Sequence, residues 1–120
     1  MTREYDGLRT FLDKCEETGE IRTISGADWE LEIGALTEST SELIPEPPAL
    51  MFDEVKGYPK GFRVLSLPVA SRVRTALALG LPTDLKPMEL VREASRRVKN
   101  AERVPPKEVE TGPVMQNIMR

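Results

Sequence analysis

The spacing of apolar residues changes along the chain between a helical and an extended period. Near the start, a stripe at i, i+3, i+4 and i+7 predicts a helix over about residues 6–18, ended by Gly19. This stripe consists of Leu8, Phe11, Leu12 and Cys15. The short β-branched run IRTIS at 21–25 predicts a strand, with Ile21 and Thr23 facing opposite to Arg22 and Ile24.

A second amphipathic segment follows this strand. Asp28 can cap a helix over about residues 29–41, and glutamates in the first turn favour the positive end of that helix. Gly34, in the middle of the helix, is consistent with close packing. The proline-rich segment 41–48 cannot continue the helix. The expected core face of this helix is Leu31, Ala35 and Leu36.

Two runs in the middle of the chain predict neighbouring strands. The first, ALMFDEV at 49–55, has apolar residues on both faces, as expected for a buried strand. Alternation places Leu50, Phe52 and Glu54 on one side, and Ala49, Met51 and Val55 on the other. After the turn KGYPKG, the run FRVLSLPV at 62–69 predicts a second strand, which pairs most simply with the first.

The second half of the chain predicts two more helices and then loses its pattern. Ser71 can cap a helix that runs to Leu79, and Pro87 can open another over about 87–98. The apolar stripe expected for this last helix is Leu90, Val91, Ala94 and Val98. We therefore predict a mixed α/β domain over residues 1–104 with about three strands and four helices, and a linker over 105–120. The pattern does not predict the order of the strands in the sheet.

Length and charge narrow the classes of function. A chain of 120 residues can bury one modest core but no additional catalytic domain. Its net charge of -3 gives no sustained positive field, so nucleic-acid binding is not expected. It has no apolar run of the roughly 18 residues that span a bilayer, and its charged start MTREYDGLRT lacks the apolar core of a signal peptide. We expect a cytoplasmic protein without nucleic-acid or membrane partners.

Histidine is absent, and Cys15 is the single cysteine. The lack of histidine removes the commonest general acid and base, the Ser-His and Cys-His nucleophile pairs, and the usual zinc sites. Cys15 lies on the helical stripe, so we interpret it as a small buried hydrophobe rather than a nucleophile. Glu30 and Glu32 point in different directions on a helix, and we interpret them as acids that favour the helix dipole rather than as an acid/base pair.

Three basic groups could bind an anion, and each also has a structural interpretation. The turn with Lys56, Tyr58 and Lys60 lacks the spacing of a phosphate loop, so a solvated hairpin is favoured. The basic residues of the last helix alternate with glutamates, which favours a solvated face with ion pairs; they are Arg92, Arg96, Arg97 and Lys99. Arg72 and Arg74 beside Ser71 are of more interest, because a helix start offers amides to an anion.

Taken together, five segments resemble the N-terminal region of the UbiD-like decarboxylases. The order and spacing of these segments are those of the family, and they cover nearly the whole chain. The most specific part is PALMFDEVKGY followed by the helix that ends in ALALG. The segments are LRTFLDKCEETGEIRTI, DWELEIGAL, PALMFDEVKGY, FRVLSLPVASRVRTALALG and TGPVMQN.

The resemblance implies a homo-oligomeric enzyme of three domains that reversibly decarboxylates an aromatic or α,β-unsaturated acid with prenylated FMN, a divalent metal (Mn²⁺ or Mg²⁺) and K⁺. It implies that this chain is the N-terminal scaffolding domain and that TGPVMQN enters the central flavin-binding domain. No catalytic, cofactor-binding or metal residue of the family maps onto a position here, so we expect this segment alone to be inactive. A stand-alone interaction or regulatory module with the same fold is the alternative.

Such a detached domain would leave apolar surface uncovered. The tail offers candidates for contact with the central domain, although a disordered terminus is an equal alternative. These residues are Val114, Met115, Ile118 and Met119.

Overall fold

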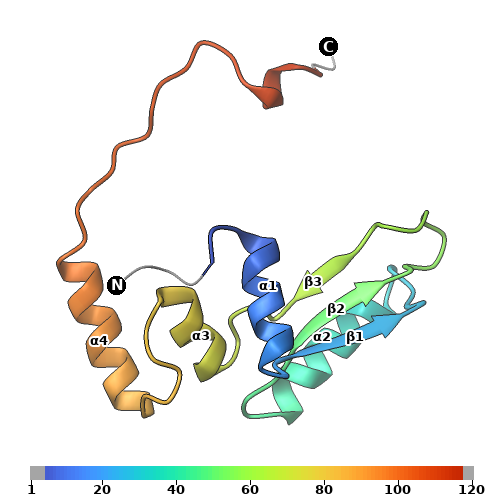
Figure 1. The fold of residues 1–120 in the computed structure, drawn as a ribbon. Helices are drawn as coiled ribbons and strands as arrows, with labels where there is room; N and C mark the ends of the chain where they lie inside the picture. The colour runs from blue at the N-terminus through green and yellow to red at the C-terminus, as the bar shows by residue number, and fades with distance from the viewer. Residues whose placement is uncertain (1–4, 118–120) are drawn as a thin grey trace.

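A three-stranded mixed sheet organises the computed structural model, which describes residues 5–117 (Figure 1). The strands lie in the order β1-β2-β3, with β1 and β2 parallel and β2 and β3 antiparallel. The expected mixed α/β class is confirmed, and the strand order left open by the sequence is now defined. The elements are α1 (Leu8–Glu17), β1 (Ile21–Ser25), α2 (Glu32–Leu43), β2 (Ala49–Asp53), β3 (Val64–Ser66), α3 (Arg72–Leu79), α4 (Pro87–Lys99) and the 3₁₀ turn η1 (Pro113–Met115).

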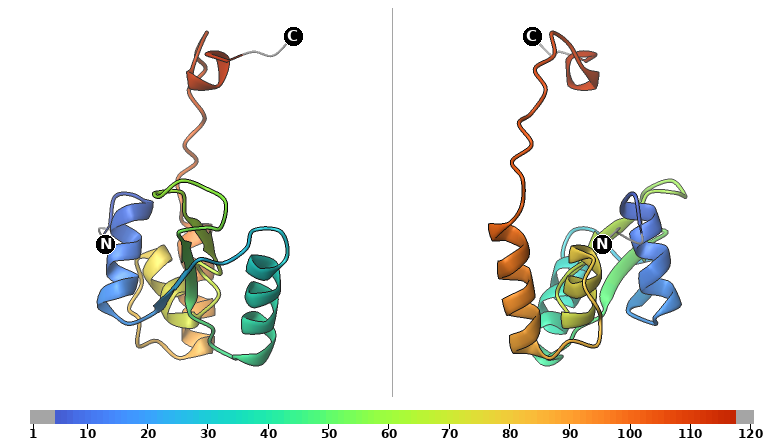
Figure 2. Two further views of the ribbon diagram at one scale, coloured as in Figure 1. Left: turned by 90° about the vertical axis from the view of Figure 1, so that its right-hand side faces the viewer. Right: turned by 60° about the vertical axis from the view of Figure 1, so that its left-hand side comes forward.

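The sheet has helices on both faces, and each face has its own apolar cluster. Figure 2 shows α1 and α2 on opposite sides of the sheet. On the α2 side, Phe52 lies in a cluster with Ala27, Leu50 and Val55, against which Ile24, Ile33, Leu36 and Leu67 pack. On the α1 side, Phe11, Cys15 and Leu77 form a second cluster, against which Tyr5, Leu12, Ile21 and Ala78 pack. Because Ile21 and Ile24 join different clusters, the alternation predicted for β1 is confirmed.

Helix α2 begins later than the sequence predicts. The carboxylate of Asp28 accepts a hydrogen bond from the Glu30 amide at 3.0 Å, and its backbone amide donates to the Glu32 carboxylate at 2.8 Å. These local bonds hold residues 28–31 in a turn, so the helix starts at Glu32. Leu31 of the predicted core face therefore lies outside the helix and is 78% exposed. Ala35 is also exposed, because the helix packs on the sheet through Ile33 and Leu36. Gly34 has no close neighbour, so the expected close packing there was wrong.

Two residues with positive φ change the outline of the β2–β3 hairpin. Glu54 has φ 46° directly after β2, which breaks the side-chain alternation. Val55 consequently packs with Leu50 and Phe52. The sequence pattern had predicted Val55 on the opposite side of the strand, so that prediction was wrong. Leu67 has φ 55° and ends β3 after three residues, well short of the predicted range. The predicted pairing of the two strands is confirmed.

The last two helices start where the sequence places them, but α4 is less covered than predicted. Ser71 caps α3 by accepting a hydrogen bond from the Arg74 amide, and Gly80 ends the helix with φ 63°. In α4, Leu90 is buried, whereas Val91 and Val98 are exposed, because α3 is the main neighbour of this helix. After α4 the chain extends away from the domain (Figure 1), with Val114 and Met115 exposed. The predicted contact residues Ile118 and Met119 lie outside the described range.

Candidate functional site: a buried arginine cluster at the start of helix α3

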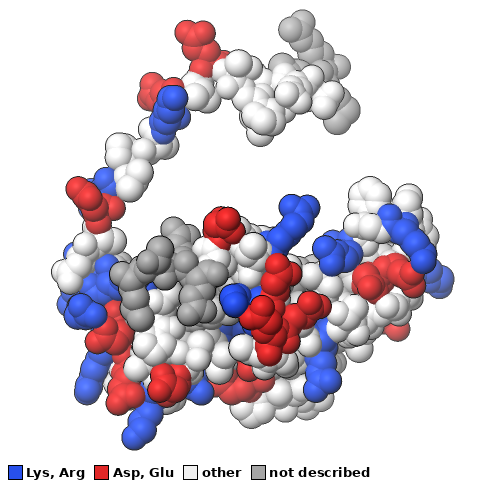
Figure 3. Space-filling view, viewed as in Figure 1, with Lys and Arg blue, Asp and Glu red and all other residues white. Residues whose placement is uncertain are grey.

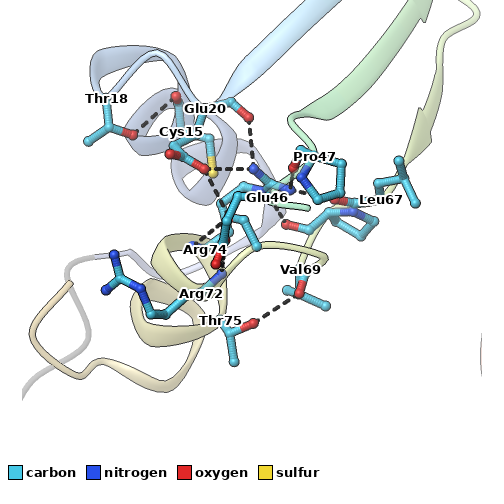
Figure 4. Close-up of polar contacts among 12 residues, drawn as sticks. Cys15, Thr18, Glu20, Glu46, Pro47, Leu67, Val69, Arg72, Arg74 and Thr75 are labelled. Carbon is cyan, nitrogen blue, oxygen red and sulfur yellow. Dashed lines mark hydrogen bonds and ion pairs between the residues drawn. The ribbon is translucent and has the colours of Figure 1, made fainter. Parts of the chain in front are cut away.

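The most concentrated group of polar interactions surrounds Arg74, in the first turn of α3. Its side chain is 0% exposed, which is rare for arginine. The capping hydroxyl of Ser71 and the sharp turn at Leu67 and Pro68 direct the chain so that the guanidinium points between the end of α1 and the segment before β2 (Figure 4). Burying a charged guanidinium is costly unless each of its N–H donors has a hydrogen-bond acceptor.

All five guanidinium N–H donors of Arg74 have an acceptor. Nε donates to the Pro68 carbonyl at 3.0 Å, and Nη2 donates to the carbonyls of Pro47 at 2.6 Å and Leu67 at 3.1 Å. Nη1 donates to the Glu20 carbonyl at 3.1 Å and to its carboxylate at 2.7 Å. Since a guanidinium has five such donors, none is left over for a ligand.

Glu20 balances the charge of this cluster. Its Oε2 lies 2.7 Å from Nη1 of Arg74 and accepts a second hydrogen bond from the Ser71 hydroxyl at 2.9 Å. The two bonds join the link between α1 and β1 to the start of α3. The cluster therefore connects segments that are far apart in the sequence, which is the role expected of a structural ion pair.

Arg72 is also held by the chain itself. Its backbone amide donates to the Glu46 carboxylate at 2.7 Å, so the positive end of α3 already carries an anionic group. The Arg72 guanidinium turns away and donates to the carbonyls of Thr83 at 2.8 Å and Leu85 at 2.6 Å, across the loop to α4. The two arginines predicted as an anion site thus lie together, but their contacts support a structural role.

The other charged candidates lie apart from this cluster, mostly in surface ion pairs. Lys56 pairs with Asp28 at 3.3 Å, and Lys60 pairs with Glu54 at 2.9 Å. In α4, Arg96 pairs with Glu93, while Arg97 donates to the carbonyls of Leu79 and Gly80 at the end of α3. Tyr58 packs against the Phe62 ring, and Glu30 is exposed in the turn before α2. Arg92 and Lys99 are exposed on α4. These contacts favour the structural interpretation of each group.

Cys15 lies beside the arginine cluster and is fully buried. Burial raises the pKa of its thiol; Arg74 opposes this effect and Glu20 reinforces it. We expect a disulfide reagent at pH 8 to label native Cys15 at least about 100-fold more slowly than the unfolded chain, because the thiolate must be exposed to react. The rate should rise at the denaturation midpoint. Rapid stoichiometric labelling without denaturant would show instead that Cys15 is accessible.

The same thiol has a consequence for stability at alkaline pH. The pKa of Cys15 in the folded protein lies above the unfolded value of about 8.5. At pH values below about 8.5, the buried thiol therefore makes its full contribution to the free energy of unfolding. This contribution is lost as the pH rises further, because the unfolded chain releases the proton first. Cys15→Ala should remove this part of the alkaline decline.

The donor set does not fit the cofactor or the divalent metal that the resemblance implies for the intact enzyme. In residues 5–117, no group of three or more His, Cys, Asp or Glu side chains could hold a metal ion. The best phosphate candidates, Arg72 and Arg74, donate to backbone carbonyls and to Glu20.

No helix within the described range has both the length and the apolar character needed to cross a membrane.

The fold and the arginine cluster define a small mixed α/β domain whose buried charges connect its own segments. Residues 12–98 match the family model of the 3-octaprenyl-4-hydroxybenzoate carboxy-lyase N-terminal domain, UbiD_N. The chain belongs to this family, which confirms the resemblance seen in the sequence.

The chain is similar to several decarboxylases. The chain is 37% identical over 94 residues to a phenolic acid decarboxylase of Streptomyces sp. (strain D7), covering 78% of this chain and 20% of that protein. It is 32% identical over 126 residues to the pyrrole-2-carboxylic acid decarboxylase of Pseudomonas aeruginosa, covering 98% and 25%. The chain therefore spans between a fifth and a quarter of the length of these relatives.

The fold is also similar to that of a decarboxylase of known structure. The vanillic acid decarboxylase of Sedimentibacter hydroxybenzoicus in open form superposes with a TM-score of 0.69 at 29% identity, covering 78% of this chain and 20% of that one. The same enzyme in closed form gives a TM-score of 0.63 at 26% identity. The similarity extends over most of the domain in both forms.

Proposed function

We propose that this chain is the N-terminal scaffolding domain of a longer decarboxylase that releases CO₂ reversibly from an aromatic or α,β-unsaturated carboxylic acid. The observation that carries the proposal is the family match over residues 12–98, together with relatives that are decarboxylases four to five times longer. The best candidates for binding an anion, Arg72 and Arg74, instead bind carbonyl and carboxylate groups of the domain itself. These contacts stabilise the domain, which supports a scaffolding role.

The chemistry of the intact enzyme would lie in later sequence. Prenylated FMN, with a divalent metal and K⁺, would supply the electron sink for decarboxylation. Residues 1–104 would form the N-terminal domain, and residues 105–120 would lead into a central flavin-binding domain. The extended course of the chain after α4 supports this division. We further propose that the intact enzyme is a homo-oligomer in the cytoplasm, where a single unpaired cysteine stays reduced.

The test compares the complete reading frame with the 120-residue chain. Both would be purified, supplied with reduced prenylated FMN, Mn²⁺ and K⁺, and assayed for CO₂ release from a panel of phenolic acids and pyrrole-2-carboxylate. We expect the complete protein to bind the flavin and to decarboxylate at least one acid, whereas the 120-residue chain does neither. A flavin-free, inactive complete protein would contradict the proposed activity, and decarboxylation by the short chain would contradict the scaffolding role.

A further inference from the structure

The sheet ends at β1 on one side and at β3 on the other (Figure 1). In a parallel pair of strands, alternate residues bond to the neighbouring strand, and the residues between them point away from it. The Ala49 amide donates to the Glu20 carbonyl at 2.9 Å, and the Gly26 amide donates to the Asp53 carbonyl at 3.1 Å. Even-numbered positions therefore face β2. The backbone N–H and C=O groups that point outward belong to Ile21, Thr23 and Ser25.

This outer edge of β1 has no partner within residues 5–117. The backbone of Thr23 points away from β2, and no other described segment makes a hydrogen bond to it. The side chains of Thr23 and Ser25 are exposed, so the neighbouring helices leave the edge open. Unpaired amides and carbonyls along an edge strand are a template for another extended chain. The edge thus defines the kind of occupant that fits it, because only an extended backbone offers matching donors and acceptors.

The two edges of the sheet differ in a way that favours pairing at β1. Strand β3 has three residues and ends at Leu67, whose φ is 55°, and at Pro68, which has no N–H to donate. Short strands, prolines and kinks are the devices that prevent pairing at an edge. Strand β1 has five residues, all with negative φ, no proline and one charged residue, Arg22. It therefore remains a regular edge that can accept a strand.

Side chains on both faces of β1 are also incompletely covered. Ile21 packs on the cluster below α1, and Ile24 packs on the cluster below α2, yet both are only half-buried. An added strand would place its own side chains beside the two isoleucines and extend both clusters. Acidic and basic side chains are interspersed on the side of the molecule that carries α1 (Figure 3), so charge selects no occupant. Backbone pairing and apolar cover select it instead.

We propose that the outer edge of β1 pairs with an extended, largely apolar segment of the polypeptide that follows residue 120, which adds a fourth strand to the sheet. The relatives are four to five times longer than this chain, and a segment of the same chain binds at a high effective concentration. A second copy fits less well, because antiparallel pairing about Thr23 would bring two Arg22 side chains to diagonal positions on one face. The inference rests on the proposed function, which supplies the longer chain.

The experiment measures amide hydrogen exchange, resolved to single residues, in the complete protein and in the 120-residue chain. We expect the outward Thr23 amide to exchange at least about 100-fold more slowly in the complete protein, because only there does it donate to another strand. The Ile24 amide is the internal control. It faces β2 in both proteins and should be protected in both, which also shows that the short chain is folded.

A variant of the complete protein tests the pairing directly. Thr23→Pro removes an N–H that points away from β2, so it blocks the added strand while leaving the β1–β2 bonds in place. The Ser25 amide should then exchange at least about tenfold faster, whereas the Ile24 amide stays protected. Thr23→Ala is the matched control, because it shortens the same side chain and keeps the N–H. It should leave the exchange of Ser25 unchanged.

Several results would overturn the inference. One is equal exchange of Thr23 in the two proteins while Ile24 is protected in both. Another is the same exchange of Ser25 in Thr23→Pro and Thr23→Ala. Protection of Thr23 in the short chain that rises with protein concentration would assign the edge to a second copy. Decarboxylation is scored separately, so an inactive complete protein with a protected Thr23 would contradict the proposed activity alone, and an active one with an unprotected Thr23 would contradict the pairing alone.

Discussion

Replacing Arg74 by methionine should lower the free energy of unfolding of this domain by about 3–5 kcal/mol, the range for breaking a buried ion pair by removing one partner. The apolar stem would still fill the space, but the carboxylate of Glu20 and four backbone carbonyls would each lose one hydrogen-bond donor at once. Small domains are stable by only about 5–15 kcal/mol, so this single loss is a large part of the total. Urea denaturation followed by circular dichroism measures it.

Two further variants identify the cause of the loss. Arg74→Lys keeps the charge but has three N–H donors for the five hydrogen bonds that the guanidinium makes. It should therefore lose less stability than Arg74→Met but remain less stable than the unaltered protein. Arg22→Met removes an exposed arginine and should change the free energy of unfolding by less than about 0.5 kcal/mol. If Arg74→Met were as mild as this control, the buried hydrogen bonds would contribute little, and the cluster would need another explanation.

The regular elements of the fold could be predicted because their signals are local. Four apolar residues in a row predict a strand buried on both faces, and β2 is such a strand. Ser71 and Gly80 bound a helix by capping chemistry that depends only on neighbouring residues, and α3 has those limits. Where local bonds compete with the helix, as at Asp28, the periodic pattern starts the helix too early, and the observed helix Glu32–Leu43 also runs past the predicted end at residue 41.

The arginine cluster could be predicted only in part, for a physical reason. Sequence patterns place Arg74 at the start of a helix but give no sign of its burial, because its acceptors come from three separate segments and most are backbone carbonyls. Carbonyls have no sequence signature, so Pro47, Leu67 and Pro68 could not be recognised as partners. Glu20 and Glu46 were likewise missed, since their roles depend on tertiary contacts across 54 and 26 residues.

The same limit applies to the uncovered surfaces. The stripes of α1 and α4 were predicted as core, but Leu8 and Val98 are exposed in this domain. Periodicity reports that a face is apolar and does not report which chain segment covers it. Exposed apolar residues in a domain that spans a quarter or less of its relatives are consistent with contacts made by the remaining sequence.

Replacing Phe52 by alanine should be the most damaging apolar change, at about 3–5 kcal/mol. Phe52 of the central strand β2 is 0% exposed, and the cluster around it includes Ile33 and Leu36, which hold α2 on the sheet. Truncation would leave a cavity that neighbouring side chains fill only in part. Urea denaturation gives the loss of stability, and amide hydrogen exchange should show α2 opening more readily than α1, because α1 packs on the opposite face.

Phe62 provides the matched control, because it is the same residue type on the same hairpin but 61% exposed. Phe62→Ala loses the contact with the Tyr58 ring and little else, so its cost should stay below about 1 kcal/mol. Phe52→Leu keeps most of the buried volume and should cost less than Phe52→Ala. Equal costs for Phe52→Ala and Phe62→Ala would contradict burial as the reason for the large effect at Phe52. If α1 opened first in Phe52→Ala, the two clusters would be coupled through β2 rather than independent.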